Sequence, residues 1–172
     1  MITRFLWWLL PYLTGQKLKH KNFDSFAGKI KNVFLIMPEN EPDVKGSQIL
    51  IDSLITKGNS VTVLINGERL ALLKNSYSYK AIEYFNTDRS KLGFPKTNLK
   101  GLLRKVRTDL VINLHREPDI FSVYCAGLIL CEYKAAFALQ TNGTFFNLQF
   151  KANNQNPQES YKNFLNCLYM FL

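Results

Sequence analysis

The sequence predicts an α/β protein with a Rossmann-like, open and mostly parallel sheet of five to six strands and helices on both faces. Short apolar runs at 31–38 (KNVFLIMP), 60–66 (SVTVLIN) and 109–114 (DLVINL) are typical of buried parallel strands. Segments with helical spacing separate these runs, as right-handed βαβ units require. The expected strand order is 3-2-1-4-5, with the sixth strand at an edge of the sheet.

The first half of the chain alternates strands and helices from residue 31 onward. The helix expected at 43–58 has Asp43 as its N-cap or as an acid of its first turn, and Gly58 as its C-cap. After the strand at 60–66 we expect a short helix at 67–75 and an alternating outer strand at 80–86. Residues 87–98 are rich in Gly, Pro, Asn and Ser, which predicts a loop.

The second half repeats the alternation. Residues 99–107 (LKGLLRKVR) predict a basic amphipathic helix, and residues 116–132 predict an apolar helix that begins near Pro118 and Asp119. Further strands are expected at 134–139 and 144–150, on either side of the turn at 141–143. A closing helix is expected at 156–172, with Pro157 in its first turn.

Length and composition indicate one domain with a buried core. The chain has 172 residues, of which 47% are hydrophobic. Residues 1–29 form an aromatic and basic N-terminal segment, and residues 30–172 form the predicted single domain. The three cysteines have no zinc-binding spacing, so we expect reduced thiols in a cytoplasmic protein and no metal site.

The net charge of +9 permits an anionic membrane surface, an acidic partner or nucleic acid. The basic helix contributes Lys100, Arg104, Lys105 and Arg107, which are more typical of a solvated face than of a nucleic-acid site. Binding to nucleic acid is therefore the least favoured of the three.

The expected ligand crevice lies where the strand order reverses, at the carboxyl ends of the strands at 31–38 and 109–114. The loops at this place are 38–43 (PENEPD) and 115–119 (HREPD). The first loop lacks GxGxxG, and the sequence contains no P-loop motif. Its three carboxylates, on Glu39, Glu41 and Asp43, would repel a diphosphate. We therefore expect no dinucleotide cofactor.

The same loops supply the candidate site residues. Asp43 and His115 are the candidates for catalysis if the protein is an enzyme, and Glu39, Arg116 and Asp119 are the candidates for ligand binding. Each has a simpler interpretation: the carboxylates are solvated or cap helices, His115 is a partly exposed loop residue, and Arg116 balances the neighbouring Glu117.

Two segments carry a resemblance to a known family. Residues 30–54 (IKNVFLIMPENEPDVKGSQILIDSL) and 107–138 (RTDLVINLHREPDIFSVYCAGLILCEYKAAFA) resemble the N-terminal Rossmann-like domain of glycosyltransferase family 9, the heptosyltransferase-like group. In that family the loop aspartate is proposed as the base on the acceptor hydroxyl, and this resemblance gives that position to Asp43. Glu39 and Pro42 replace the family's loop glycines.

The resemblance covers one of the family's two Rossmann domains. The family holds its nucleotide-sugar mainly through the second domain, which has no counterpart among the elements expected here. The layout is also similar to small bacterial domains of unknown function that share this half-fold.

The segment 5–13 (FLWWLLPYL) is too short to span a bilayer, which needs about 20 apolar residues. It also lacks the small-residue cleavage site of a signal peptide. It is expected either to lie on a membrane surface, or to pack on a partner, a second copy or its own domain. The expected contact residues are Phe5, Trp7, Trp8, Leu9, Tyr12, Lys17, Lys19 and Lys21.

Together these features favour a non-catalytic binding or accessory module, at the cytoplasmic face of the inner membrane or in a protein complex. The first alternative is a reduced glycosyltransferase-like enzyme that acts on envelope sugars. The second is a basic nucleic-acid-binding module.

Overall fold

The computed structural model describes residue 14 and residues 30–74, 78–139, 145–151 and 156–170. Its centre is one six-stranded sheet in the order β3-β2-β1-β4-β5-β6. All five pairs of neighbouring strands are parallel. The predicted fold class and strand order are therefore confirmed. The strands are β1 (Asn32–Ile36), β2 (Ser60–Asn66), β3 (Lys80–Tyr84), β4 (Leu110–Asn113), β5 (Tyr133–Phe137) and β6 (Leu148–Phe150).

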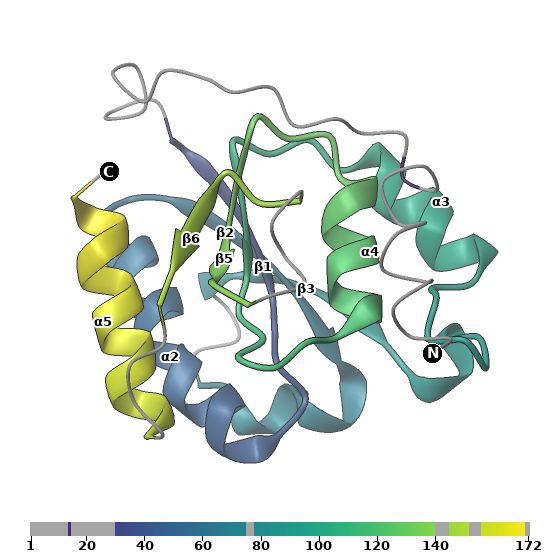
Figure 1. Ribbon diagram of the computed structural model, residues 1–172, viewed down its shortest axis with the longest axis horizontal. Coiled ribbons are helices and arrows are strands. Elements are labelled where there is room, and N and C mark those ends of the chain that lie inside the picture. The colour runs from purple at the N-terminus through teal and green to yellow at the C-terminus, as the bar shows by residue number, and fades with distance from the viewer. Residues whose placement is uncertain (1–13, 15–29, 75–77, 140–144, 152–155, 171–172) are drawn as a thin grey trace.

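Helices cover both faces of the sheet. Figure 1 shows α2 (Glu41–Thr56) and α5 (Pro157–Tyr169) on one side, and α3 (Thr97–Lys105) and α4 (Ile120–Leu128) on the other. Two 3-10 helices, η2 (Gly67–Leu72) and η4 (Asn86–Asp88), flank β3 in the chain. The short helix expected at 67–75 is thus a 3-10 helix, and the loop expected at 87–98 contains the end of η4 and the start of α3.

The side chains of β1 alternate between the two layers of the core. Val33 and Leu35 point to the layer that α2 and α5 cover, and Phe34 and Ile36 point to the layer that α3 and α4 cover. All four are at most 1% exposed. A strand buried on both faces has no polar face, which explains why its sequence is a continuous apolar run.

Helix α2 begins earlier than the sequence predicted. Asn40 is its N-cap, because the Asn40 side chain accepts a hydrogen bond from the backbone N–H of Asp43 at 2.9 Å. Asp43 is therefore an acid of the first turn, where a negative charge faces the positive end of the helix dipole. At the other end Lys57 is the C-cap, and Gly58 follows it with φ of 85°. The carboxylates of Glu41 and Asp43 belong to this helix and not to an irregular loop.

Helix α4 is shorter than the predicted 116–132. Asp119 is its N-cap and accepts a hydrogen bond from the backbone N–H of Ser122 at 2.8 Å. The helix ends at Leu128, and Ile129 has extended backbone angles. The last strand is likewise shorter than 144–150. Its described part, Leu148–Phe150, pairs with β5. All three cysteines are unpaired, and Cys125 is buried.

Candidate functional site

The carboxyl ends of β1 and β4 lie side by side, because these strands pair in parallel from Val33–Leu110 to Ile36–Asn113. The residues after β1 lead into α2, and the residues after β4 lead into α4. Since β2 continues the sheet on one side and β5 on the other, this is the point at which the strand order reverses. We call the residues gathered here the carboxyl edge.

Asp43 and Arg116 form an ion pair across the carboxyl edge. The Asp43 carboxylate accepts a hydrogen bond from Arg116 Nε at 2.5 Å and another from Asn40 Nδ2 at 2.6 Å. Asp43 is only 3% exposed. Burial lowers the pKa of Arg116, but the hydrogen bond and charge of Asp43 outweigh it, so the pKa is raised. The partner of Arg116 is therefore Asp43, far along the chain, where the simpler interpretation had chosen Glu117.

Tyr161 of α5 lies next to this ion pair. Its hydroxyl donates a hydrogen bond to the carbonyl oxygen of Leu114 at 2.7 Å, and its side chain is fully buried. Burial, followed by the negative charge of Asp43, raises the pKa of Tyr161. The hydroxyl therefore stays protonated at neutral pH. The sequence analysis missed Tyr161, because nothing in the pattern of the closing helix indicates that its hydroxyl meets polar groups.

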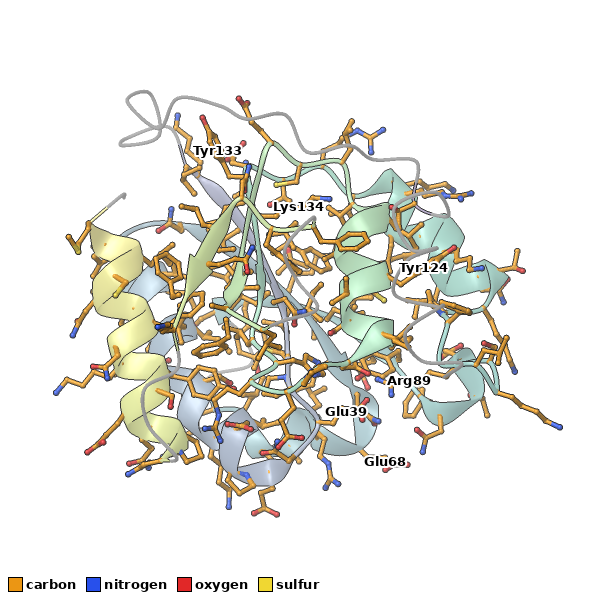
Figure 2. The ribbon with its side chains drawn as sticks, viewed as in Figure 1. Glu39, Glu68, Arg89, Tyr124, Tyr133 and Lys134 are labelled. Atoms are coloured by element: carbon orange, nitrogen blue, oxygen red, sulfur yellow. The ribbon has the colours of Figure 1, made fainter. Side chains whose placement is uncertain are left out.

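Glu39 belongs to a second cluster at the carboxyl edge. It accepts a hydrogen bond from Tyr84 Oη at 2.9 Å and forms a salt bridge with Arg89. Arg89 also donates to Tyr84 Oη at 3.1 Å, and its guanidinium lies 3.8 Å from the centre of the Phe121 ring. Figure 2 shows Glu39 and Arg89 at the same end of the sheet. Arg89 and Tyr84 were missed because one follows η4 and the other ends an outer strand.

His115 lies beside this second cluster and is buried. It is 8% exposed, so the expectation of a partly exposed loop histidine is wrong. Its Nδ1 lies 3.8 Å from Asp119 Oδ2, which is too long for a hydrogen bond. Burial lowers its pKa, although the charges of Asp119 and Glu39 act to raise it. The imidazole is therefore neutral at pH 7.

Two buried nitrogen atoms at the carboxyl edge have no hydrogen-bond partner among the described residues. They are His115 Nε2 and Arg89 Nε. The backbone around His115 is held more fully, because its N–H donates to Asn113 Oδ1 at 3.2 Å and Asn113 Nδ2 donates to Ser122 Oγ at 3.0 Å. A buried polar atom without a partner is costly, so these two nitrogens mark the place where a small polar group would be accepted.

The structure brings all five predicted site residues to the carboxyl edge. Asp43 and Arg116 face one another, Glu39 is tied to Arg89 and Tyr84, and Asp119 serves α4 as a cap next to His115. Within the described part of the chain, no three His, Cys, Asp or Glu residues are arranged to hold a metal ion. The carboxylates of Asp43 and Glu39 are paired with the guanidinium groups of Arg116 and Arg89. The acids of the carboxyl edge are therefore held in ion pairs within the protein.

The eight contact residues expected between Phe5 and Lys21 lie outside the described residues. Thr14 is described and lies against α4, because a Cβ added at Gly127 would be 2.4 Å from Thr14 Cγ2. None of the described helices is long and apolar enough to cross a membrane.

Comparison with known proteins gives a likeness of fold. No family model matches the sequence, and no curated protein matches it. Among solved structures, a glycosyltransferase family 9 protein from Veillonella parvula has a TM-score of 0.62 and 16% identity, over 82% of this chain and 41% of that chain. The heptosyltransferase WaaC of E. coli, with ADP-2-deoxy-2-fluoro heptose, has a TM-score of 0.56 and 16% identity, over 82% and 48%.

A xanthine dehydrogenase from Bacillus halodurans also matches, with a TM-score of 0.50 and 11% identity, over 83% of this chain and 42% of that chain. The chain spans less than half the length of each of these three structures. The family 9 resemblance seen in the sequence is thus confirmed at the level of the fold: this chain has the Rossmann-like architecture of part of a glycosyltransferase.

Proposed function

We propose that this chain is a non-catalytic binding or accessory module with a glycosyltransferase-like half-fold, held at the cytoplasmic face of a membrane by its N-terminal segment. The proposal that the module is non-catalytic rests on the burial and the hydrogen bonds of Asp43. By the family resemblance this is the position of the base, yet the side chain is buried and bound to Arg116 and Asn40.

A general base must reach the proton that it removes, at about 2.6–3.2 Å, with a lone pair free to accept it. Both oxygens of the Asp43 carboxylate already accept a hydrogen bond, Oδ1 from the Arg116 guanidinium and Oδ2 from the Asn40 amide. Glu39 is engaged in the same way by Arg89 and Tyr84. The geometry therefore supports a structural role for both acids.

The catalytic question is tested by thermal unfolding with a panel of ADP-, UDP- and GDP-sugars, together with an assay for nucleotide release. We expect no concentration-dependent rise in melting temperature and no released nucleotide. Asp43→Asn is compared with its own ligand-free melting temperature, because the substitution itself weakens the fold. Nucleotide release by the natural sequence that is lost in Asp43→Asn would instead establish the transferase.

Membrane attachment rests on the composition of the N-terminal segment. Residues 1–31 contain six Lys or Arg and a single acid, next to two tryptophans and a tyrosine. Aromatic rings favour the headgroup region, and each basic residue near an anionic surface contributes about 1 kcal/mol.

We expect co-sedimentation with phosphatidylserine vesicles, little with phosphatidylcholine vesicles, and none after residues 1–21 are deleted. Replacing Lys17, Lys19 and Lys21 with glutamate separates the charge contribution from that of Trp7 and Trp8. If the deletion converts a dimer to a monomer on a sizing column and vesicles never bind, the segment is a protein interface.

A reduced glycosyltransferase is the second candidate, and one observation favours it. The unpartnered nitrogens of His115 and Arg89 lie at the edge where this fold binds ligands. In that case a nucleotide-sugar would raise the melting temperature, and His115→Phe would abolish the rise. Arg104→Ala, far from this edge on α3, is the control that should leave any rise unchanged.

A further inference from the structure

A groove runs between β3 and α3, away from the carboxyl edge. It has a volume of about 770 Å³, within the range of about 300–1,000 Å³ that ligand sites occupy. Thr62, Lys80 and Ile82 line it from the sheet. Gly101, Leu102 and Lys105 line it from α3, with Val106 and Arg107 just beyond the helix.

The groove combines an apolar floor with a basic rim. Leu102 is 43% exposed there, and Ile82 and Val106 are partly buried against the core. The charged residues of its lining are Lys80, Lys105 and Arg107, so the lining contains three cations and no acid. An occupant that complements this surface carries apolar side chains inward and carboxylates along the rim.

The strand beside the groove is an edge strand. In the described sheet β3 pairs only with β2, in parallel over five residues from Lys80 to Tyr84. The outer side of an edge strand offers backbone N–H and C=O groups to another extended chain. In a strand added there, every second side chain would point to the same face of the sheet as Ile82. These side chains would enter the groove between β3 and α3.

We propose that this groove binds an extended acidic segment of a partner protein, which adds to the sheet beside β3. The lining contains no aromatic residue on which bases would stack, which argues against single-stranded nucleic acid. Its concave shape does not fit a flat lipid surface. Pairing of this groove with the same groove of a second copy is disfavoured, because the three cations of one groove would repel the three cations of the other.

The probe is a fluorescent ten-residue peptide with glutamate and valine in alternating pairs (EEVVEEVVEE), so that each face of the added strand carries both residue types. The control is the same peptide with lysine in place of glutamate. We expect the acidic peptide to bind and the basic peptide not to bind. Lys80→Glu with Lys105→Glu should weaken binding roughly tenfold, because two favourable charge pairs become repulsive. Arg107 is kept, since its Nη1 donates to the carbonyls of Arg104 and Val106 at the end of α3.

Two further variants separate binding from folding. Arg104→Glu reverses a charge on the same helix outside the groove lining and should leave the affinity unchanged. Gly101→Leu fills the groove, and a Cβ at Gly101 meets no atom within 4 Å, so the fold should tolerate it. Binding should be lost while the melting temperature stays equal or rises, since leucine is the better helix former.

The mode of binding is read from hydrogen exchange. Strand addition should slow exchange of the amides in residues 80–84 when the acidic peptide is bound. Absence of binding at millimolar peptide, or binding that Gly101→Leu leaves intact, overturns the proposal. It is also overturned if oligo-dT or phosphatidylserine vesicles bind the groove, with loss in Lys80→Glu/Lys105→Glu, and the acidic peptide does not.

Discussion

Arg116 donates a hydrogen bond from Nε to the buried Oδ1 of Asp43 at 2.5 Å, and the two residues are 73 positions apart in the chain. The contact joins the start of α2 to the residues that follow β4. It makes the buried Asp43 carboxylate part of a brace between two βα units. The strength of that brace is open to direct measurement.

Removing Arg116 should leave a buried carboxylate without its charge partner. Breaking a buried pair in this way costs about 3–5 kcal/mol. Arg116 keeps 18% of its side chain exposed, so we expect the lower end of that range for Arg116→Met. Urea unfolding at pH 7.5 gives the loss in free energy of unfolding.

The matched control is the double variant Asp43→Asn/Arg116→Met, which removes both charges. It should recover a substantial part of the stability lost in Arg116→Met, because no unpaired charge remains. Equal losses in the single and double variants would contradict a stabilising ion pair.

His115 should make the fold sensitive to mild acid. Its folded pKa lies below the ordinary value of 6.5, so the unfolded chain binds the proton more readily. This contribution to stability is complete above pH 6.5 and is lost as the pH falls below 6.5, at about 1.4 kcal/mol per pH unit until the folded pKa is reached.

The measurement is the free energy of unfolding at pH 7.5, 6.5 and 5.5 for the natural sequence and for His115→Gln. The difference between the two should shrink as the pH falls. A constant difference between the natural sequence and His115→Gln would show that His115 does not titrate differently on folding.

Lys134 is a fully buried lysine in β5, at the end of the sheet opposite Glu39 and Arg89 (Figure 2). Its Nζ donates a hydrogen bond to the carbonyl oxygen of Ala126 in the last turns of α4, at 2.7 Å. Burial lowers its pKa from 10.5 to about 8. Between pH 8 and 10.5 the unfolded chain therefore holds more protons, and this group makes stability rise with pH.

We expect the stability of the natural sequence relative to Lys134→Met to rise by about 1 kcal/mol between pH 8 and pH 9, because the folded lysine is still half protonated at pH 8. The comparison with Lys134→Met is needed because burial raises the pKa of Cys125 and Cys131, which lowers stability as the pH rises through 9. A relative stability that does not change with pH would mean that the Lys134 side chain keeps its ordinary pKa in the folded protein.

Gly46 permits the close approach of α2 and α5. A Cβ at this position would be 3.1 Å from Tyr161 Cδ2 and 3.2 Å from the backbone carbon of Pro157. Since backbone cannot move aside as a side chain does, Gly46→Leu should cost about 1–3 kcal/mol by forcing the helices apart.

The control is Gly101→Ala, a helical glycine with open space around it, which should gain about 0.5–1 kcal/mol from helix propensity. Thermal unfolding of both variants gives the comparison. A neutral Gly46→Leu would mean that the contact between α2 and α5 is loosely packed.

Much of the fold was predictable because its signals are local. Apolar runs placed the strands. Helical spacing, with Asp119 and Pro157, placed most helices, and the right-handed crossover rule limits how such elements connect. Boundaries were less certain: α2 begins at Glu41 because the Asn40 side chain caps it, whereas the sequence predicted a start at Asp43.

The sequence predicted where the candidate residues lie in the fold, but not which side chains they contact. Glu39, Asp43, His115, Arg116 and Asp119 meet at the carboxyl edge as expected from the switch-point rule. Arg89 and Tyr161 were not expected there. They come from a segment before α3 and from the closing helix, and only packing brings them to the acids.

The sequence by itself determined a parallel sheet with helices on both faces and the edge at which its polar loops gather. Hydrophobic periodicity acts over a few residues, and the connection rules then limit how the elements join. Only the tertiary structure decided that Asp43 and Glu39 are held by Arg116 and Arg89, that His115 is buried, and that a basic groove opens beside β3. The physical reason is distance along the chain: the charge and accessibility of a carboxylate depend on side chains that meet it only after the helices have packed.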